Sequence, residues 1–337
     1  CHGHMDKWRT HHARVGGLSA SSPSFVLNLH VSNLCSMNIA YLISAHTDPA
    51  QLRRLVLALH PDAEFFIHID SKSPLEQFTS CLQLPRVHYI SERVDVRWGT
   101  MREVQYQMNL IRAAVTFPRQ FDRIFFLSGM DYPMWSNARI VNWLEQQGER
   151  EILQGYCMDT VLLDAWQRET YTVARPFCRH VRVGILMRKL LRLTGYRKPL
   201  HFSVQGNEWQ LYKGSAWWCI SQHLAEYILD QYDHNAELLH YFRNSFCPAE
   251  TLIQTIAFNH PLWRQRCILT EGKYPGLELL TPLHFIDYSG FIHVMTEEDH
   301  SRLRESGKMF CRKVVTGKSD RIVAMLDKDR AAEAGRE

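Results

Sequence analysis

Residues 38–70, NIAYLISAHTDPAQLRRLVLALHPDAEFFIHID, decide the fold class of this chain. The apolar run at 38–44 is short and stops at a polar segment before Pro49, as a buried strand does. The apolar residues from 52 to 59 recur at helical spacing, and residues 65–70 form the next buried strand. A strand, a helix and a second strand in succession predict two parallel, neighbouring strands.

The same alternation continues along the first half of the chain. We predict strands at 87–90 and 123–127 and helices at 100–116 and 137–147. The fold class is therefore α/β, with a Rossmann-like, mostly parallel central sheet flanked by helices. Ligands of such sheets bind at the carboxyl ends of the strands. The polar residues expected at that edge are 44–48, 70–72 and 128–131.

The periodic signal weakens from 151 to 202 and resumes with a strand at 214–221 that leads into a helix at 222–231. We interpret the weak region as an irregular helical insertion. The expected divisions are a tag or a non-native, disordered leader at 1–36, one domain at 37–326 and a frayed tail at 327–337. Within the domain we expect a nucleotide-binding half at 37–150, a variable insertion at 151–213 and an acceptor and catalytic half at 214–326.

Composition excludes several classes of protein. A net charge of +4 over 337 residues does not indicate a nucleic-acid-binding protein. The nine cysteines contain no C-x-x-C pair, which argues against a disulfide framework and a zinc site and fits a reducing compartment. No apolar stretch approaches the roughly 18 residues of a membrane-spanning helix. We expect a cytoplasmic protein, in contact at most with the surface of the inner membrane.

The segment Phe246–Thr251 contains the strongest candidate for a catalytic residue. Pro248 suits a first helical position, which makes Glu250 the third helical residue. Unpaired N–H groups and the helix dipole favour an ionised carboxylate there, and an ionised carboxylate can act as a general base. The alternative is an ordinary first-turn glutamate.

Familiar nucleotide-binding and hydrolase motifs are missing. The chain contains no G-x-x-x-x-G-K-[ST] phosphate loop, no G-x-G-x-x-G fingerprint and no G-x-S-x-G elbow. Readings as an ATP-loop protein, a dinucleotide-binding enzyme or an α/β-hydrolase therefore lose their strongest support.

Seven short pieces stand in order along the chain. They are AYLI at 40–43, IHIDSK at 67–72, VRWG at 96–99, LSGMDYP at 127–133, GSAWW at 214–218, PAE at 248–250 and FCRK at 310–313. Any one of these is weak, but the ordered set is specific. From about residue 38 to 314 the chain resembles glycosyltransferase family 14, which groups the Core 2 and I-branching β-1,6-N-acetylglucosaminyltransferases with the peptide O-xylosyltransferases.

The resemblance implies a GT-A fold and an inverting transfer from a UDP-sugar, with Glu250 as the base. It also implies catalysis without a metal, because Asp70 is followed by Ser71 and Lys72 where an Asp-x-Asp motif would bind one. We accordingly expect no cofactor and no metal ligand, with UDP-sugar as the donor substrate.

Cationic side chains would then stabilise the departing diphosphate. Lys313 matches the family position for this role, with help from Arg312. His284 stands where the family carries a second arginine, so either it is protonated there or another cation takes over. The alternatives for that cation are Arg264, Arg266 and Lys273.

The resemblance assigns the remaining site residues to two groups. The nucleotide-binding group is Ser44, Ala45, His46, Asp70 and Lys72. The sugar and acceptor group is Trp98, Asp131, Trp217 and Trp218. For each we also weigh a structural role: a polar strand end, a turn at Asp131, and a core position for one of the two adjacent tryptophans, which alternate across a strand.

A basic segment at 179–198 interleaves arginine and lysine with aliphatic residues, which predicts an amphipathic helix. It could lie on an anionic membrane near a lipid-linked acceptor, or pack on the core as a solvated helix.

We expect a bacterial enzyme of polysaccharide or glycoconjugate synthesis that transfers GlcNAc or xylose from a UDP-sugar to a glycan or lipid-linked glycan. The alternatives are a non-catalytic nucleotide-sugar-binding protein, in which His284 marks a decayed diphosphate site, and a peripheral membrane adaptor.

Overall fold

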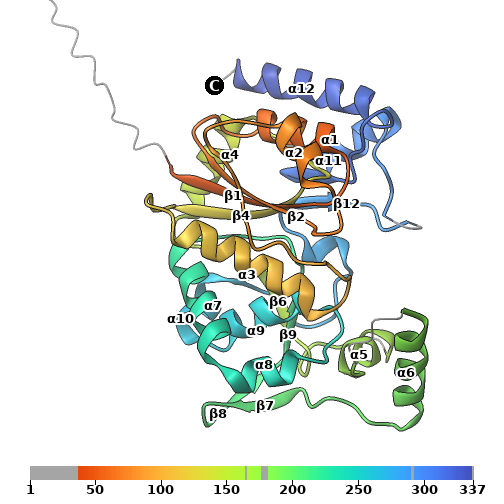
Figure 1. Cartoon of the computed structure of the whole chain (residues 1–337). Coiled ribbons are helices and arrows are strands. Elements are labelled where there is room, and N and C mark those ends of the chain that lie inside the picture. The colour runs from red at the N-terminus through yellow and green to blue at the C-terminus, as the bar shows by residue number, and fades with distance from the viewer. Residues whose placement is uncertain (1–36, 164, 176–180, 290–291, 336–337) are drawn as a thin grey trace, which may run out of the picture. The chain divides into compact units, whose positions relative to one another are not determined.

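A five-stranded sheet with the order β10-β4-β1-β2-β3 forms the centre of the computed structural model (Figure 1). The strands β1 to β4 are parallel, and only β10 runs antiparallel to its neighbour β4. The described residues are 37–163, 165–175, 181–289 and 292–335, so the predicted leader at 1–36 lies outside them. The strand bounds are β1 Ile39–Ala45, β2 Glu64–Ile69, β3 Val87–Tyr89, β4 Arg123–Ser128 and β10 Cys219–Ile220.

The sheet confirms the predicted α/β class and its parallel strands. Side chains of β1 alternate between two cores, with Ala40 and Leu42 in one and Tyr41 and Ile43 in the other. Both faces are thus covered, which explains why the predicted strands are almost continuously apolar.

Helices cover both faces of the sheet (Figure 1). On one face lie α1 Pro49–Ala58, α2 Leu75–Cys81, α4 Asn137–Gln147, α11 His300–Glu305 and α12 Asp320–Ala334. On the other lie α3 Met101–Val115, α7 Gln222–His234, α8 Ala236–Phe242, α9 Leu252–Phe258 and α10 Pro261–Arg266. The helices predicted from 52–59, 100–116, 137–147 and 222–231 are confirmed as α1, α3, α4 and α7.

The order of the strands indicates where a ligand crevice should lie in the sheet. From β1 the chain moves outward to β2 and β3 and then returns to β4 on the other side of β1. A parallel sheet opens outside the carboxyl ends of its strands at such a switch point. Ser44 and Ser128 are paired in register there, at the ends of β1 and β4.

Three smaller sheets extend the fold. The first has the order β11-β6-β9, the second β12-β13-β5, and the third is the hairpin β7-β8. Their bounds are β5 Asp131–Pro133, β6 Gln154–Cys157, β7 His201–Val204, β8 Asn207–Gln210, β9 Tyr212–Gly214, β11 Ile268–Leu269, β12 His284–Ile286 and β13 Phe310–Arg312. The single strand predicted at 214–221 is therefore split between β9 and β10. Within the predicted insertion lie two helices, α5 Ala165–Thr172 and α6 Val181–Leu193.

The tail predicted to fray from residue 327 is instead the second half of α12. Tyr132 donates a hydrogen bond of 2.8 Å to Asp327, and Arg139 pairs with Glu333 at 2.7 Å. The backbone N–H of Ser136 also donates to Glu333. Charged residues that looked like a solvated tail are thus bound to β5 and the start of α4.

The basic segment predicted at 179–198 also differs from the structure. Arg179 lies outside the described residues, and α6 ends at Leu193. Lys198, expected on an exposed helical face, is buried, with its ammonium donating to Tyr241 O and Ser245 Oγ. Burial lowers the pKa of Lys198 to about 8.

We predict that Gly214→Ala lowers the free energy of unfolding by about 1–3 kcal/mol. Gly214 pairs with Gly155 of β6, and a Cβ atom on Gly214 would come 2.0 Å from the carbonyl oxygen of Gln154. Urea denaturation measures the change. Gly335→Ala is the control, because the nearest atom to its Cβ is 3.6 Å away. Equal stability of the two variants would contradict the predicted close approach.

Candidate active site

The predicted nucleotide-binding residues gather at the carboxyl edge of the central sheet. Asp70 N–H donates to Ala45 O at 2.9 Å, and Gly129 N–H donates to Ser44 O at 2.9 Å. Burial lowers the pKa of His46; Asp70 opposes this decrease, while the charges of Lys313, Arg312 and Lys72 add to it. The sequence-predicted nucleotide and diphosphate residues at the carboxyl ends of β1, β2 and β13 therefore lie close enough for their charges to interact.

Two lysines at this edge differ in how they are bound. Lys72 forms ion pairs of 2.8 Å with Asp70 and with Asp95, a residue that sequence reasoning missed. Lys313 is partly buried, and its ammonium has no hydrogen-bond or ion-pair partner among the described residues. Burial and the charge of Arg312 lower the pKa of Lys313. Lys313 is thus the cation that is available to an anionic ligand.

Asp131 and His284 lie in the interior, without exposed surface. Asp131 accepts hydrogen bonds from Ser128 N at 2.8 Å, His284 Nε2 at 3.1 Å and Arg312 Nη1 at 2.9 Å. Burial alone would raise the pKa of Asp131, but His284, Arg312 and the Ser128 N–H outweigh it and lower the pKa. In this conformation Asp131 holds Arg312 and His284 rather than facing solvent.

The three tryptophans occupy different environments. Trp218 is fully buried and stacks on Phe126 with ring centroids 5.3 Å apart, so it is the core member of the adjacent pair. Trp217 packs 4.6 Å from the Arg312 guanidinium. Trp98 is 67% exposed. Only Trp98 of the three lines the cavity described below.

Glu250 ends a short 3-10 turn, Pro248–Glu250, and α9 begins only at Leu252. Its N–H donates to Cys247 O at 3.0 Å. Glu250 thus lies before α9 and not in its first turn, and its carboxylate is held by side chains from other parts of the chain. Tyr171 donates to Glu250 Oε2 at 2.6 Å, and the ammonium of Lys213, which has no exposed surface, lies 3.2 Å from the same oxygen.

The two oxygens of the Glu250 carboxylate therefore have different surroundings. Both of these contacts use Oε2, and Oε1 accepts no hydrogen bond from the described residues. The side chain is 30% exposed and lines a cavity of about 650 Å³. A carboxylate with one oxygen anchored and the other open has the geometry of a general base.

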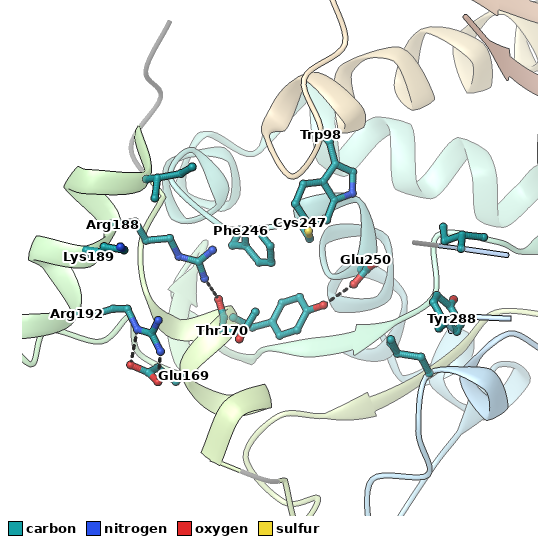
Figure 2. A pocket seen from close by; sticks show the side chains of 14 residues that line it. Trp98, Glu169, Thr170, Arg188, Lys189, Arg192, Phe246, Cys247, Glu250 and Tyr288 are labelled. Carbon is teal, nitrogen blue, oxygen red and sulfur yellow. Dashed lines mark hydrogen bonds and ion pairs between the residues drawn. The ribbon is translucent and has the colours of Figure 1, made fainter. Parts of the chain in front are cut away.

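The cavity lies between the Glu250 segment and the predicted insertion. Figure 2 shows the basic residues of α6 on one side and Glu250 and Tyr288 on the other. Its lining residues are Trp98, Glu169, Thr170, Tyr171, Ile185, Arg188, Lys189, Arg192, Phe246, Cys247, Glu250, Leu277, Tyr288 and Ile292.

Gly99 fixes the position of Trp98 at the cavity. Its backbone has a φ of 72°, which favours glycine, and a Cβ atom would come 2.3 Å from Arg175 Nη1 and 3.3 Å from Phe246. Cys247 N–H donates to Gly99 O at 3.2 Å. The Trp98–Gly99 piece and the Cys247–Glu250 piece, far apart in the sequence, are thus joined directly.

A second carboxylate, Glu103, lies behind this loop. It accepts a hydrogen bond of 2.6 Å from Gly99 N–H. Burial raises the pKa of Glu103 to about 7, with a contribution from the charge of Glu250, while Gly99 and Arg175 act in the opposite direction.

Sequence reasoning missed Lys213, Tyr171 and Glu103. Lys213 had a usable signal, because it is a lone lysine between Tyr212 and Gly214, next to the GSAWW piece. Tyr171 had none, since its region matched no motif. The alternative cations Arg264 and Arg266 lie elsewhere: Arg264 packs 5.9 Å from Tyr212, and Arg266 pairs with Glu149 at 2.7 Å. Lys273 is exposed.

Two further observations concern only the residues that the structure describes. No group of three or more His, Cys, Asp or Glu side chains is arranged to hold a metal ion. No helix is long and apolar enough to cross a membrane.

Comparison with known proteins gives a consistent family. A family model described as "Core-2/I-Branching enzyme" matches residues 39–301. A xylosyltransferase of Ciona intestinalis is 21% identical over 67% of this chain and 25% of its own length. Beta-glucuronosyltransferase GlcAT14B of Arabidopsis thaliana is 23% identical, over 86% and 66%. An N-acetyllactosaminide beta-1,6-N-acetylglucosaminyl-transferase of Mus musculus is 24% identical, over 63% and 50%. The chain thus spans between a quarter and two thirds of the length of these relatives.

We predict that Glu103→Gln changes the pH dependence of stability. Because the pKa of Glu103 is raised by folding, its contribution to stability is present below about pH 4.5 and is lost as the pH rises through about 7. The variant stays neutral, so its unfolding free energy relative to the parent should rise by about 1–3 kcal/mol between pH 5 and pH 8.5.

Urea denaturation at the two pH values measures this difference. The control is Glu271→Gln, which removes an exposed carboxylate and should differ from the parent by a constant amount. A pH-independent difference for Glu103→Gln would show that the Glu103 carboxyl ionises normally.

Proposed function

The chain belongs to the Core-2/I-branching enzyme family, and we propose that it is a metal-independent, inverting glycosyltransferase with a GT-A fold. It would transfer a sugar from a UDP-sugar to a hydroxyl group of a glycan. The observation that carries the proposal is Glu250, which belongs to a family-like PAE piece and presents one free carboxylate oxygen to a cavity.

The donor is proposed to be UDP-GlcNAc or UDP-xylose. The names of the relatives include a xylosyltransferase, a beta-1,6-N-acetylglucosaminyl-transferase and a beta-glucuronosyltransferase. UDP-glucuronic acid therefore joins the two donors considered from the sequence. We propose that the uridine lies at the edge formed by Ser44, His46 and Asp70.

The proposed reaction is one displacement. Glu250 Oε1 takes the proton from the acceptor hydroxyl, whose oxygen forms a bond to the anomeric carbon of the donor. The bond from that carbon to the diphosphate oxygen breaks, and its electron pair leaves with UDP. Attack opposite the leaving group converts the α-linked donor into a β-linked product. Lys213 and Tyr171 hold Oε2 and so orient the base.

Lys313 is proposed to stabilise the departing diphosphate, because it lies at the sheet edge and its ammonium has no hydrogen-bond or ion-pair partner in the described part of the chain. Arg312 is held by Asp131 and Trp217, so it contributes a fixed positive charge nearby. Preorganised cations of this kind are often a large part of catalysis. Together the two side chains would replace a divalent metal.

A second candidate is a nucleotide-sugar-binding protein without turnover. It is favoured by one observation: His284, at the position of the family's second diphosphate arginine, is buried and bound to Asp131. Such a protein would bind UDP but release no product.

We also propose that α6 contacts an anionic membrane and that the acceptor is lipid-linked. Seven of the twelve large apolar side chains that are exposed in the described residues lie between Val183 and Tyr196. The charged residues of α6, namely Arg182, Arg188, Lys189 and Arg192, are all basic. Exposed apolar and basic residues on one helix are the features of an interfacial helix.

We predict that sugar transfer persists in EDTA and depends on Glu250 and Lys313. With UDP-GlcNAc, UDP-xylose and UDP-glucuronic acid as donors, Glu250→Gln should lower kcat by about 10²–10⁴-fold. Lys313→Ala should lower it by about 10²–10³-fold. Release of UDP measures both hydrolysis and transfer.

The matched controls are Glu271→Gln and Lys318→Ala, which change exposed residues outside the cavity. A requirement for Mn²⁺ or Mg²⁺, or full activity of the Glu250 and Lys313 variants, would contradict the mechanism. UDP binding without any product would favour the non-catalytic alternative.

We predict that the protein co-sediments with vesicles that contain phosphatidylglycerol. Replacing Leu186 and Leu190 together by glutamate should weaken binding at least about tenfold, because apolar area and positive charge both drive it. The control replaces Leu57 and Leu262 by glutamate; both leucines are exposed on other helices. The membrane assignment would be contradicted if the parent did not bind the vesicles. It would also be contradicted if the parent were a dimer and only the α6 variant were a monomer.

A further inference from the structure

We propose that the cavity selects an acceptor that carries an anionic group next to the sugar that is glycosylated. The group is a carboxylate or a phosphate, recognised by Arg188 and Arg175. This inference rests on the proposed glycosyltransferase function, since it assigns the substrate class of the same cavity.

Two guanidinium groups pack against the ring of Phe246. Phe246 and Arg188 line the cavity, whereas Arg175 contacts Phe246 without lining the cavity itself. The Arg188 guanidinium lies 4.1 Å from the centre of the Phe246 ring, and the Arg175 guanidinium lies 5.3 Å from it. Arg175 is anchored through its backbone, whose N–H donates to Asn244 O at 2.7 Å. Phe246 thus brings together arginines from two separate parts of the predicted insertion.

Neither arginine has a carboxylate partner in the part of the chain that the structure describes. Arg188 donates to Thr170 O at 2.7 Å, and Arg175 makes only a long contact of 3.5 Å to Gly99 O. Burial and the charge of Arg175 lower the pKa of Arg188. Two neighbouring positive charges without an ion-pair partner are stabilised when an anion binds near them.

The nearby carboxylates are occupied. Glu169 pairs with Arg192 at 2.7 Å and with Arg197 at 3.2 Å. Glu103 accepts the N–H of Gly99, and Glu250 is held by Lys213 and Tyr171. The charges of Glu103 and Glu169 act on Arg175 and Arg188 respectively, but neither arginine forms an ion pair with a carboxylate of the described residues, so a ligand can supply one.

Aromatic contacts link the two arginines to the proposed base. Tyr171, which donates to Glu250, has its ring centre 5.9 Å from that of Phe246. Trp98 contacts Phe246 edge to face at 5.4 Å and exposes most of its surface. A sugar on this aromatic surface can direct a hydroxyl to Glu250 and an anionic substituent to Arg188 (Figure 2).

Acceptor specificity tests the inference, with 4-nitrophenyl β-glucoside, 4-nitrophenyl β-glucuronide and glucose 1-phosphate as probes. The parent should favour at least one anionic probe over the neutral glucoside by about tenfold or more in kcat/KM. Arg188→Gln and Arg175→Gln should each remove most of that preference. Preference for the glucuronide indicates a uronic acid, and preference for the phosphate indicates a phosphorylated carrier.

The control is Arg182→Gln, an exposed arginine of α6 outside the cavity, which should keep the preference. Arg188→Lys, which retains the charge, should restore part of it. An equal loss with neutral and anionic probes in Arg188→Gln would show a merely structural role and overturn the inference.

A second readout does not depend on turnover. Calorimetric titration of the UDP-bound parent with the glucuronide and with glucose 1-phosphate should give tighter binding than the glucoside, and Arg188→Gln should abolish the difference. If the parent shows no preference for the anionic probes in binding or in transfer, the inference is overturned and the proposed function stands. If the protein binds the anionic probes but neither hydrolyses the donor nor transfers its sugar, the proposed function is overturned instead.

Discussion

A carboxylate without access to water stays ionised only when donors surround it, and Asp131 is in that position. Its donors come from the end of β4, from β12 and from β13. The same pairing therefore joins the central sheet to the small sheet that ends just before Lys313. Asp131 fixes the position of Arg312, and Lys313 is the next residue in the chain. Lys313 therefore lies near the crevice at the switch point between β1 and β4, where we propose that the donor binds.

The proposed base depends on a second buried pairing. Lys213 has no exposed surface, so its ammonium requires an anionic neighbour, and Glu250 supplies it. The cation and Tyr171 share one oxygen of the carboxylate and leave the other open to the cavity. The arrangement fixes the direction of the carboxylate, and it does so from β9 and α5 rather than from the helix that follows Glu250.

The cavity combines a family-like motif with a region that has no motif. Glu250 and Trp98 come from the recognisable pieces, whereas Tyr171 and Arg188 come from the insertion. The proposed chemistry thus lies in one part of the chain and the proposed choice of acceptor in another. Such a division lets an inserted segment change specificity while the reacting groups keep their positions.

The sequence by itself determined the α/β class, the parallel strands β1 to β4 and the candidate base Glu250, because apolar periodicity and short motifs are local properties. It also predicted that one of Trp217 and Trp218 is core. Only the tertiary structure decided the partners of Glu250, the burial of His284 and the order of the tail in α12. Those outcomes depend on contacts between residues far apart in the chain, such as Tyr132 with Asp327 and Asp131 with Arg312. No local pattern encodes which distant donor will neutralise a buried charge.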